Sequence, residues 1–199
     1  MSDPILEAAE AALGGGLVVL PTDTVYGIGT RPDDPVATAR LFEAKGRPRD
    51  LELPVLVASR ADAEAIVAFD DRARSLAGRF WPGPLSIVLG RTERSRPWDL
   101  GEDTATIAVR MPHHPLALAV LARTGPLAVT SANRSGEPTP EIAEGLREVF
   151  GDAVEVYLCE EVPLAGRPST VVDLTGPDLR VVRLGAVSED DVRAALAAG

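Results

Sequence analysis

Apolar and polar positions follow one another along the chain in blocks that predict helices and strands from end to end. Short apolar runs rich in Val, Leu and Ile alternate with longer stretches of helical spacing. The expected strands are 17–20, 55–58, 85–89, 104–109, 126–130, 154–158, 170–174 and 180–182. The expected helices are 3–13, 36–44, 59–69, 71–80, 114–123, 139–150 and 188–199. Because the late strands follow one another without helices between them, the pattern predicts an α/β fold with a mixed sheet.

Residues with capping chemistry mark several of the expected helix ends. Asp3 precedes Pro4 at the start of the first helix, and three glycines follow that helix at 14–16. Comparable start signals occur at Ser59 with Asp62, Thr139 with Pro140, and Ser188 with Asp191. These signals predict where the helices begin.

Two segments are expected to lie outside helices and strands. Trp81–Pro84 predicts a turn, because two prolines flank a glycine and neither can donate a ladder hydrogen bond. Arg91–Asp103 is polar and charged, and it predicts an exposed loop of low order. Gly27 and Gly29 fall outside every expected strand.

The composition favours one soluble domain spanning residues 1–199. The chain is 45% hydrophobic and 25% charged, and no apolar run is long enough to span a bilayer. The first residues lack the positive charge of a secretory signal. Cys159 has no partner for an internal disulfide, which favours a reducing, cytoplasmic location.

The charge of the chain restricts the kind of partner that it can bind. A net charge of −10 argues against a surface that coats nucleic acid, so any polyanion must meet a local basic site. Lys45 is the only lysine beside nineteen arginines, and it opens the densest basic segment, Lys45–Arg49. A compact ammonium suits a polyphosphate, although a solvated loop explains the segment equally well.

Common catalytic templates are absent. The sequence has no Walker A motif, no G-x-S-x-G, no H-E-x-x-H and no C-x-x-C. His113 and His114 are adjacent and point in different directions, so we expect them to be structural or exposed. Neither a covalent nucleophile nor a histidine metal site is therefore indicated.

Several expected strands instead end in hydroxyl, amide or arginine residues. Ligand sites in α/β proteins gather such residues at the edges of the sheet. The five ends are Thr22–Thr24, Arg110, Ser131–Asn133, Ser169–Thr170 and Arg183. Any single one has an ordinary structural explanation, but all five together predict a binding site.

The same segments carry a resemblance to a known family. The motifs are PTDTVYGIG, KGRPRD followed by LPVLV, WPGPLSIVL, TIAVRMP, TSANRSGEPTP, PSTVVDL and VVRLG. In order and spacing the chain resembles the YrdC-like family of L-threonylcarbamoyladenylate synthases, from about Leu17 to Val187. The resemblance implies a YrdC-like fold, in which helices flank a twisted mixed sheet with a concave ligand-binding face.

The resemblance also implies an activity. Such an enzyme makes threonylcarbamoyl-AMP and pyrophosphate from L-threonine, bicarbonate or CO2, and ATP, for the t6A modification of tRNA adenosine 37. It is a nucleotidyltransferase that works with Mg2+ brought by ATP, and it needs no protein metal ligands. Its implied partner is a tRNA-modifying threonylcarbamoyl transferase, with weak RNA binding as a further possibility and no membrane.

Matching positions imply residue roles. Threonine would be held by Thr24, Arg110 and Ser169. ATP would be held by Lys45, Arg47, Thr106, Ser131, Asn133 and Arg183. Lys45 and Arg47 would also be the catalytic residues, because they offset charge as it moves onto pyrophosphate.

Departures from the family and two rival functions remain at this stage. Many relatives have Asn and His where this chain has Leu51 and Leu56. The chain also resembles the short form of the family, without an added C-terminal domain. The rivals are an RNA-binding or ribosome-associated module, and a paralogue that keeps the fold and nucleotide pocket without this synthesis. The loop 47–53 is the segment that we expect to close over the site.

Overall fold

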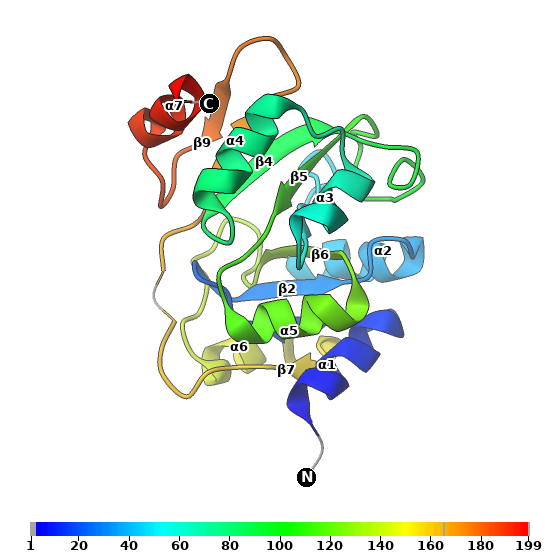
Figure 1. Ribbon diagram of the computed structural model, residues 1–199. Helices are drawn as coiled ribbons and strands as arrows, with labels where there is room; N and C mark the ends of the chain where they lie inside the picture. The colour runs from blue at the N-terminus through cyan, green and yellow to red at the C-terminus, as the bar shows by residue number, and fades with distance from the viewer. Residues whose placement is uncertain (1–2, 165, 199) are drawn as a thin grey trace.

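The computed structural model describes residues 3–164 and 166–198 (Figure 1). Within them, nine strands form one mixed sheet in the order β7-β1-β2-β6-β3-β5-β4-β8-β9, which confirms the predicted sheet type. The strands are β1 (Val18–Leu20), β2 (Gly27–Thr30), β3 (Val55–Leu56), β4 (Leu85–Gly90), β5 (Thr106–Arg110), β6 (Leu127–Ser131), β7 (Val156–Tyr157), β8 (Thr170–Asp173) and β9 (Arg180–Arg183).

Helices cover both faces of this sheet. They are α1 (Pro4–Leu13), α2 (Pro35–Lys45), α3 (Arg60–Ile66), α4 (Asp71–Phe80), α5 (Pro115–Thr124), α6 (Ala143–Phe150) and α7 (Glu189–Ala197), with a 3-10 turn at Gly151–Ala153. α1 and α5 lie together near the N-terminus, whereas α7 lies beside β9 and α4 at the other end (Figure 1). No described helix combines the length and apolar character that crossing a bilayer would need.

The alternation of side chains along the strands divides the core in two. Leu56 packs in a smaller core with α1 and α5, while its neighbours Val55 and Val57 pack in the larger core on the opposite face. This division follows from the period of two in a strand, which sends successive side chains to opposite faces. The smaller core leaves part of its face of the sheet uncovered, and the site described below lies there.

Most predicted helix starts are confirmed by their caps. The side chains of Asp3, Ser59 and Ser188 each accept a hydrogen bond from a backbone N–H in the first helical turn. The last helix is described as far as Ala197, and the predicted end at Gly199 lies outside the described residues.

The predicted start of the helix 139–150 is wrong. α6 begins at Ala143, and its N-cap residue Ile142 makes no side-chain cap hydrogen bond. The Thr139 hydroxyl donates instead to Asn133 Oδ1 at 3.3 Å. A residue with cap chemistry therefore serves the binding site and not the helix.

The strand β2 was missed because its sequence, Gly-Ile-Gly-Thr, has low strand propensity. It lies near the middle of the sheet, antiparallel to both β1 and β6. A Cβ at Gly29 would lie 2.5 Å from the carbonyl oxygen of Ala128 and 2.6 Å from Val129 Cγ2. Glycine is required here by close packing against β6.

Arg91–Asp103 lies outside the helices and strands, as predicted, but the expectation of an exposed segment of low order is wrong. The Arg91 guanidinium is buried and donates to the carbonyl oxygens of Thr106, Trp98 and Asp103 at 2.7–3.0 Å. Other buried residues of the segment are Ser95, Trp98 and Leu100. One arginine thus satisfies the backbone of a polar segment that would otherwise need water.

Candidate active site

A cavity of about 330 Å³ brings together most of the predicted site residues. They arrive from six separate parts of the chain. The predicted residues that line it are Thr24, Arg47, Arg110, Ser131, Asn133, Ser169 and Arg183. The predicted Lys45 and Thr106 are not among the lining residues.

The register of the strands places these side chains over one face of the sheet. Arg110 is aligned with Leu56, and Arg183 is aligned with Val171, which is in turn aligned with Ser86. β6 runs antiparallel to β3, and β3 runs parallel to β5. Ser131 and Arg110, the last residues of β6 and β5, therefore lie at opposite ends of the strands. The residues therefore meet across a face of the sheet, as the resemblance implied, and not at the ends of neighbouring strands, where such residues often gather.

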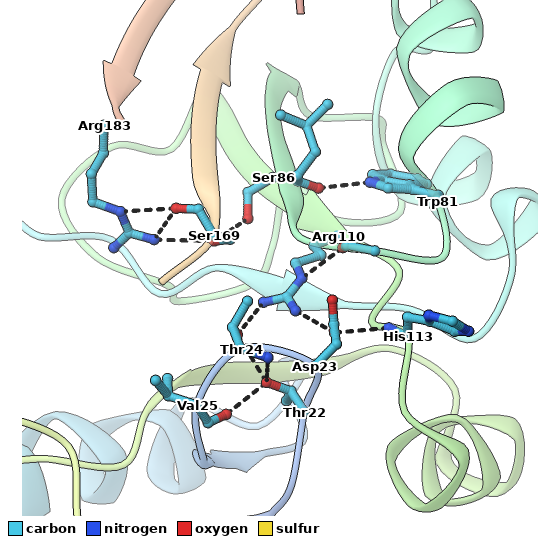
Figure 2. Close-up of polar contacts among 12 residues, drawn as sticks. Thr22, Asp23, Thr24, Val25, Trp81, Ser86, Arg110, His113, Ser169 and Arg183 are labelled. Atoms are coloured by element: carbon cyan, nitrogen blue, oxygen red, sulfur yellow. Dashed lines mark hydrogen bonds and ion pairs between the residues drawn. The ribbon is translucent and has the colours of Figure 1, made fainter. Parts of the chain in front are cut away.

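Arg110 is the most tightly held cation of the site (Figure 2). Its Nε donates to the Gly83 carbonyl at 3.0 Å, Nη1 to Thr24 Oγ1 at 3.0 Å, and Nη2 to Asp23 Oδ1 at 2.5 Å. Burial lowers the pKa of Arg110, and the Asp23 carboxylate acts in the opposite direction. A guanidinium has five N–H donors, so one on each terminal nitrogen has no partner among the described residues.

The hydroxyls of the 22–24 turn form a small network below Arg110 (Figure 2). Thr22 Oγ1 lies 2.9 Å from Thr24 Oγ1 and donates to the Val25 carbonyl at 2.6 Å. The Thr24 N–H donates back to Thr22 Oγ1 at 3.2 Å. The hydroxyl-rich end of β1 is thereby fixed as a turn that faces the cavity.

A second polar group lies across the cavity from this turn. Ser86 Oγ and Ser169 Oγ are 3.1 Å apart, and Arg183 Nη2 donates to Ser169 Oγ at 3.0 Å (Figure 2). Arg183 also donates to the Ser169 carbonyl. Sequence reasoning missed Ser86, because a single serine inside an apolar run gives no signal except its place in the period of the strand.

Lys45 lies behind the cavity wall and not in it. It is the last residue of α2, 1% exposed, and its Nζ donates to the carbonyl oxygens of Ser131 and Asn133 at 2.5 and 2.6 Å. The left-handed Gly46, at φ 57°, ends α2 at this residue. Burial lowers the pKa of Lys45 to about 8, with a smaller contribution from Arg47. Lys45 therefore tethers the loop after β6, and its implied contact with a triphosphate stays a prediction.

Asn133 also acts on this loop, although it lines the cavity. Its Nδ2 donates to the carbonyl oxygens of Arg134 and Glu137 at 2.7 and 2.8 Å. The Ser135 N–H donates to the Lys45 carbonyl at 2.9 Å. The segment Ser131–Thr139 is thus shaped by two side chains that were predicted as ATP ligands.

Arg47 lines the cavity from the segment that was expected to close. Its Nε and Nη2 donate to the carbonyls of Leu51 and Glu52 at 2.7 and 3.0 Å, and burial lowers its pKa. The same segment is bonded to its neighbour 98–103, through Leu53 N–H to Leu100 O and Glu102 N–H to Arg49 O. These bonds argue against closure, which stays a prediction.

Thr106 lies on the same face of β5 as Arg110 but four residues away, about 13 Å along the strand. Its hydroxyl donates to the Asp103 carboxylate. The implied role of Thr106 in binding ATP therefore requires a ligand that extends well beyond the cavity.

The two family departures and the two histidines have clear positions. Leu56 lines the cavity and gives it an apolar wall, whereas the Leu51 side chain is exposed.

Neither histidine is among the cavity-lining residues: His113 donates its backbone N–H to Asp23, and His114 Nε2 lies 3.2 Å from Glu160 Oε1. Burial lowers the pKa of His114.

The charges of the site are distributed unevenly. Arg110 has an acidic partner, whereas Lys45, Arg47 and Arg183 form no ion pair within the described residues. Arg47 and Arg183 line the cavity and Lys45 lies behind its wall, in a chain with 30 acidic and 20 basic residues. The arrangement favours a ligand that carries several negative charges.

Comparison with known proteins identifies the family of this chain. The Sua5/YciO/YrdC family profile, described as telomere recombination, matches residues 10–185. A Mycobacterium tuberculosis protein is 47% identical over 94% of this chain and 87% of its own length. The threonylcarbamoyl-AMP synthase of Chromohalobacter salexigens is 38% identical over 90% of this chain and 97% of its own length. The crystal structure of P. abyssi Sua5 complexed with L-threonine has 35% identity and a TM-score of 0.87, over 98% of this chain and 58% of that one. This chain belongs to the Sua5/YciO/YrdC family.

Proposed function

We propose that this chain is a threonylcarbamoyl-AMP synthase. It joins L-threonine, bicarbonate or CO2, and ATP into threonylcarbamoyl-AMP, with release of pyrophosphate. The observation that carries the proposal is one cavity lined by the buried Arg110 and by two further arginines, Arg47 and Arg183, that form no ion pair within the described residues. A relative of nearly equal length, 38% identical, is named for this activity.

The Arg110 side of the cavity holds threonine in this proposal. Two N–H donors of Arg110, one on each terminal nitrogen, have no partner in the described part of the chain and suit a carboxylate bound through both its oxygens. Thr24 and Ser169 line the same space with hydroxyls that can reach the amino and hydroxyl groups of the substrate. P. abyssi Sua5, at 35% identity, has been crystallised with L-threonine.

ATP occupies the remaining part of the cavity, toward Arg47, Ser131, Asn133 and Arg183. Arg47 and Arg183 place unpaired positive charge beside the phosphates. Lys45 acts through the loop that it tethers, because its ammonium already binds two carbonyls. Mg2+ enters with ATP as part of the substrate. No three His, Cys, Asp or Glu side chains among the described residues are grouped to hold a metal ion.

The chemistry requires no nucleophile from the protein. The threonine amine takes up CO2 and loses a proton, which gives a carbamate. A carbamate oxygen then attacks the α-phosphorus of ATP, and the bond from that phosphorus to the pyrophosphate oxygen breaks. The residues of the cavity bring the two substrates together and stabilise the charge that moves onto pyrophosphate.

The product is a mixed anhydride, so a transferase must consume it before water does. We place that transferase in the t6A modification of tRNA adenosine 37, as an expected partner, with cytoplasmic location and weak RNA binding also kept as predictions. The alternative of an RNA-binding module without this synthesis has no support in the comparisons.

Pyrophosphate release tests the proposal directly. The assay omits threonine, bicarbonate and ATP in turn, and we expect release only when all three are present with Mg2+. Mass spectrometry of the mixture identifies threonylcarbamoyl-AMP. Release that is independent of threonine would contradict the proposal and would point to simple ATP hydrolysis.

A further inference from the structure

Asp23 lies beside Arg110, between it and His113 (Figure 2), and is not among the cavity-lining residues. Its Oδ1 accepts two hydrogen bonds, from Arg110 Nη2 at 2.5 Å and from the His113 backbone N–H at 2.8 Å. The side chains of Arg110 and Asp23 are 7% and 14% exposed. One carboxylate oxygen therefore joins the 22–24 turn to the segment that follows β5.

The other partners of Arg110 cannot fix it as firmly. The Gly83 carbonyl and the Thr24 hydroxyl lie 3.0 Å from their Arg110 donors, whereas Asp23 Oδ1 lies 2.5 Å from Nη2 and is itself held by the His113 N–H. Arginine is also among the side chains with the most rotamer freedom to lose. Removing Asp23 would leave the guanidinium without its strongest restraint.

We propose that Asp23 is a positioning residue for the reaction. It fixes the Arg110 guanidinium so that the remaining N–H donors on Nη1 and Nη2 face the cavity, and it thereby sets the affinity for the carboxylate of the amino-acid substrate. The inference rests on the proposed function. Asp23 acts through Arg110 and does not touch the substrate.

The useful property of Asp23 in this role is its position and not its charge. Its Oδ2 is buried and has no hydrogen-bond partner among the described residues. A carboxylate so close to the clamp also repels the carboxylate of the substrate. An acceptor oxygen at the Oδ1 position is what holds both Arg110 and His113.

Two conservative variants separate position from charge. Asp23→Asn keeps an acceptor oxygen at the same place and removes the charge. Asp23→Glu keeps the charge and moves the oxygens by one methylene. Asp23→Ala removes both properties.

The decisive readout compares L-threonine with L-threoninamide, which lacks the carboxylate. The amide is measured as an inhibitor competitive with threonine in the pyrophosphate assay, and both ligands are also titrated by calorimetry. A purely structural role of Asp23 would weaken the two ligands equally. A positioning role weakens threonine and leaves the amide nearly unchanged.

We expect Asp23→Ala and Asp23→Glu to raise the threonine KM by about 10-fold to 100-fold, with the KM for ATP within about threefold of wild type. The affinity ratio of threonine to threoninamide falls about tenfold in both variants and stays within about threefold of wild type in Asp23→Asn. Asp173→Asn is the matched control, because Asp173 is also buried, pairs with Arg180 at 2.6 Å and is not a cavity-lining residue. That control leaves the ratio unchanged.

An unchanged ratio in a folded Asp23→Ala or Asp23→Glu protein would overturn the inference. The inference would also be overturned if Asp23→Asn lowered the ratio as much as Asp23→Ala and Asp23→Glu did not lower it. The charge of Asp23 would then matter, and its position would not. If the Asp23→Ala protein does not fold, the Asp23→Asn and Asp23→Glu variants still test the inference. A wild-type protein without threonine-dependent pyrophosphate release would instead refute the proposed function itself.

Discussion

The two sides of the cavity are held in different ways. On the Arg110 side, side chains bind side chains, and the arginine has a carboxylate partner in Asp23. On the other side, formed by Arg47 and by Lys45 behind the cavity wall and called the Lys45 side below, both side chains donate only to backbone carbonyls within the described residues. On the first side, Asp23 neutralises the charge of Arg110. On the second side, the cations have no acidic partner among the described residues, and their hydrogen bonds to carbonyls shape the loops.

This difference suits two kinds of ligand. A single carboxylate needs fixed geometry more than strong charge, because binding through both its oxygens depends on the orientation of the guanidinium. A triphosphate needs net positive charge, which an acidic partner would cancel. If the two sides are as distinct as their contacts, variants on one side should change the binding of one substrate and spare the other.

The largest effect is expected for Arg110→Met, which removes the clamp and leaves the Asp23 carboxylate buried without its partner. Breaking a buried pair in this way costs about 3–5 kcal/mol of unfolding free energy, and threonine-dependent turnover should fall by more than about 100-fold. Urea denaturation and pyrophosphate release measure the two effects. Arg180→Gln serves as the control, because the Arg180 side chain is 75% exposed although its partner Asp173 is buried. Turnover within about tenfold of wild type would show that the carboxylate binds elsewhere.

A smaller effect is expected for Lys45→Met, which keeps the apolar stem and removes the ammonium. The protein should stay folded but lose most turnover, with ATP binding weakened about 10-fold to 150-fold, or about 1.5–3 kcal/mol. Trypsin should cut faster after Arg134, because the loop after β6 loses its tether. The threonine affinity should stay within about threefold of wild type; equal losses for both substrates would mean that the two sides are not separate.

Deprotonation of Lys45 at high pH should have a smaller effect on activity than its substitution. The pKa of Lys45 is about 8, so the ammonium and its charge-assisted bonds are present below that pH and are lost above it. We expect kcat/KM for ATP to fall about tenfold between pH 7 and 9, with a flat profile in Lys45→Met. A wild-type profile that is flat through pH 9 would contradict the role of the charged tether.

The same pKa has a consequence for stability. The folded value lies below the ordinary value of 10.5, so burial of the ammonium lowers the free energy of unfolding at pH values below about 8. That cost disappears as the pH rises from about 8 to 10.5. The protein therefore retains a destabilising charge beside its cavity, as functional sites commonly do.

The smallest effect is expected for Thr106→Val. The hydroxyl of Thr106 is used by Asp103 and lies far along β5 from Arg110, so the KM for ATP should change by less than about twofold. An increase above about tenfold would show that the nucleotide extends across the sheet to the start of β5. The nucleotide-binding site would then extend beyond the cavity.

The sequence predicted the residues of the site better than their arrangement. Polar residues at Thr24, Arg110, Ser131, Ser169 and Arg183 interrupt or end apolar strands, and that signal is local. Their meeting across one face depends on the antiparallel pairing of β3 with β6, which no local pattern encodes. The fold class was predictable for the same reason as the residues, since it follows from the order of the segments.

The errors also have particular physical causes. No signal in the sequence indicated that Lys45 holds a loop: the end of α2 at Gly46 directs it to two carbonyls of a segment 86 and 88 residues away, while its contact with ATP stays a prediction. The segment Arg91–Asp103 looked exposed because its composition is polar, although one buried arginine folds it. β2 was missed because glycine, which close packing requires there, is a poor strand former.

The unpaired cations of the Lys45 side lie in a molecule whose total charge is −10. Large polyanions therefore approach against a repulsive field, while a compact nucleotide can pass through it to reach the positive interior. Added salt would screen both the outer repulsion and the inner attraction. The protein therefore selects ligands by size as well as by charge. Moderate salt should reduce the association rate of a small nucleotide with this protein less than it would reduce the association rate with a uniformly basic protein.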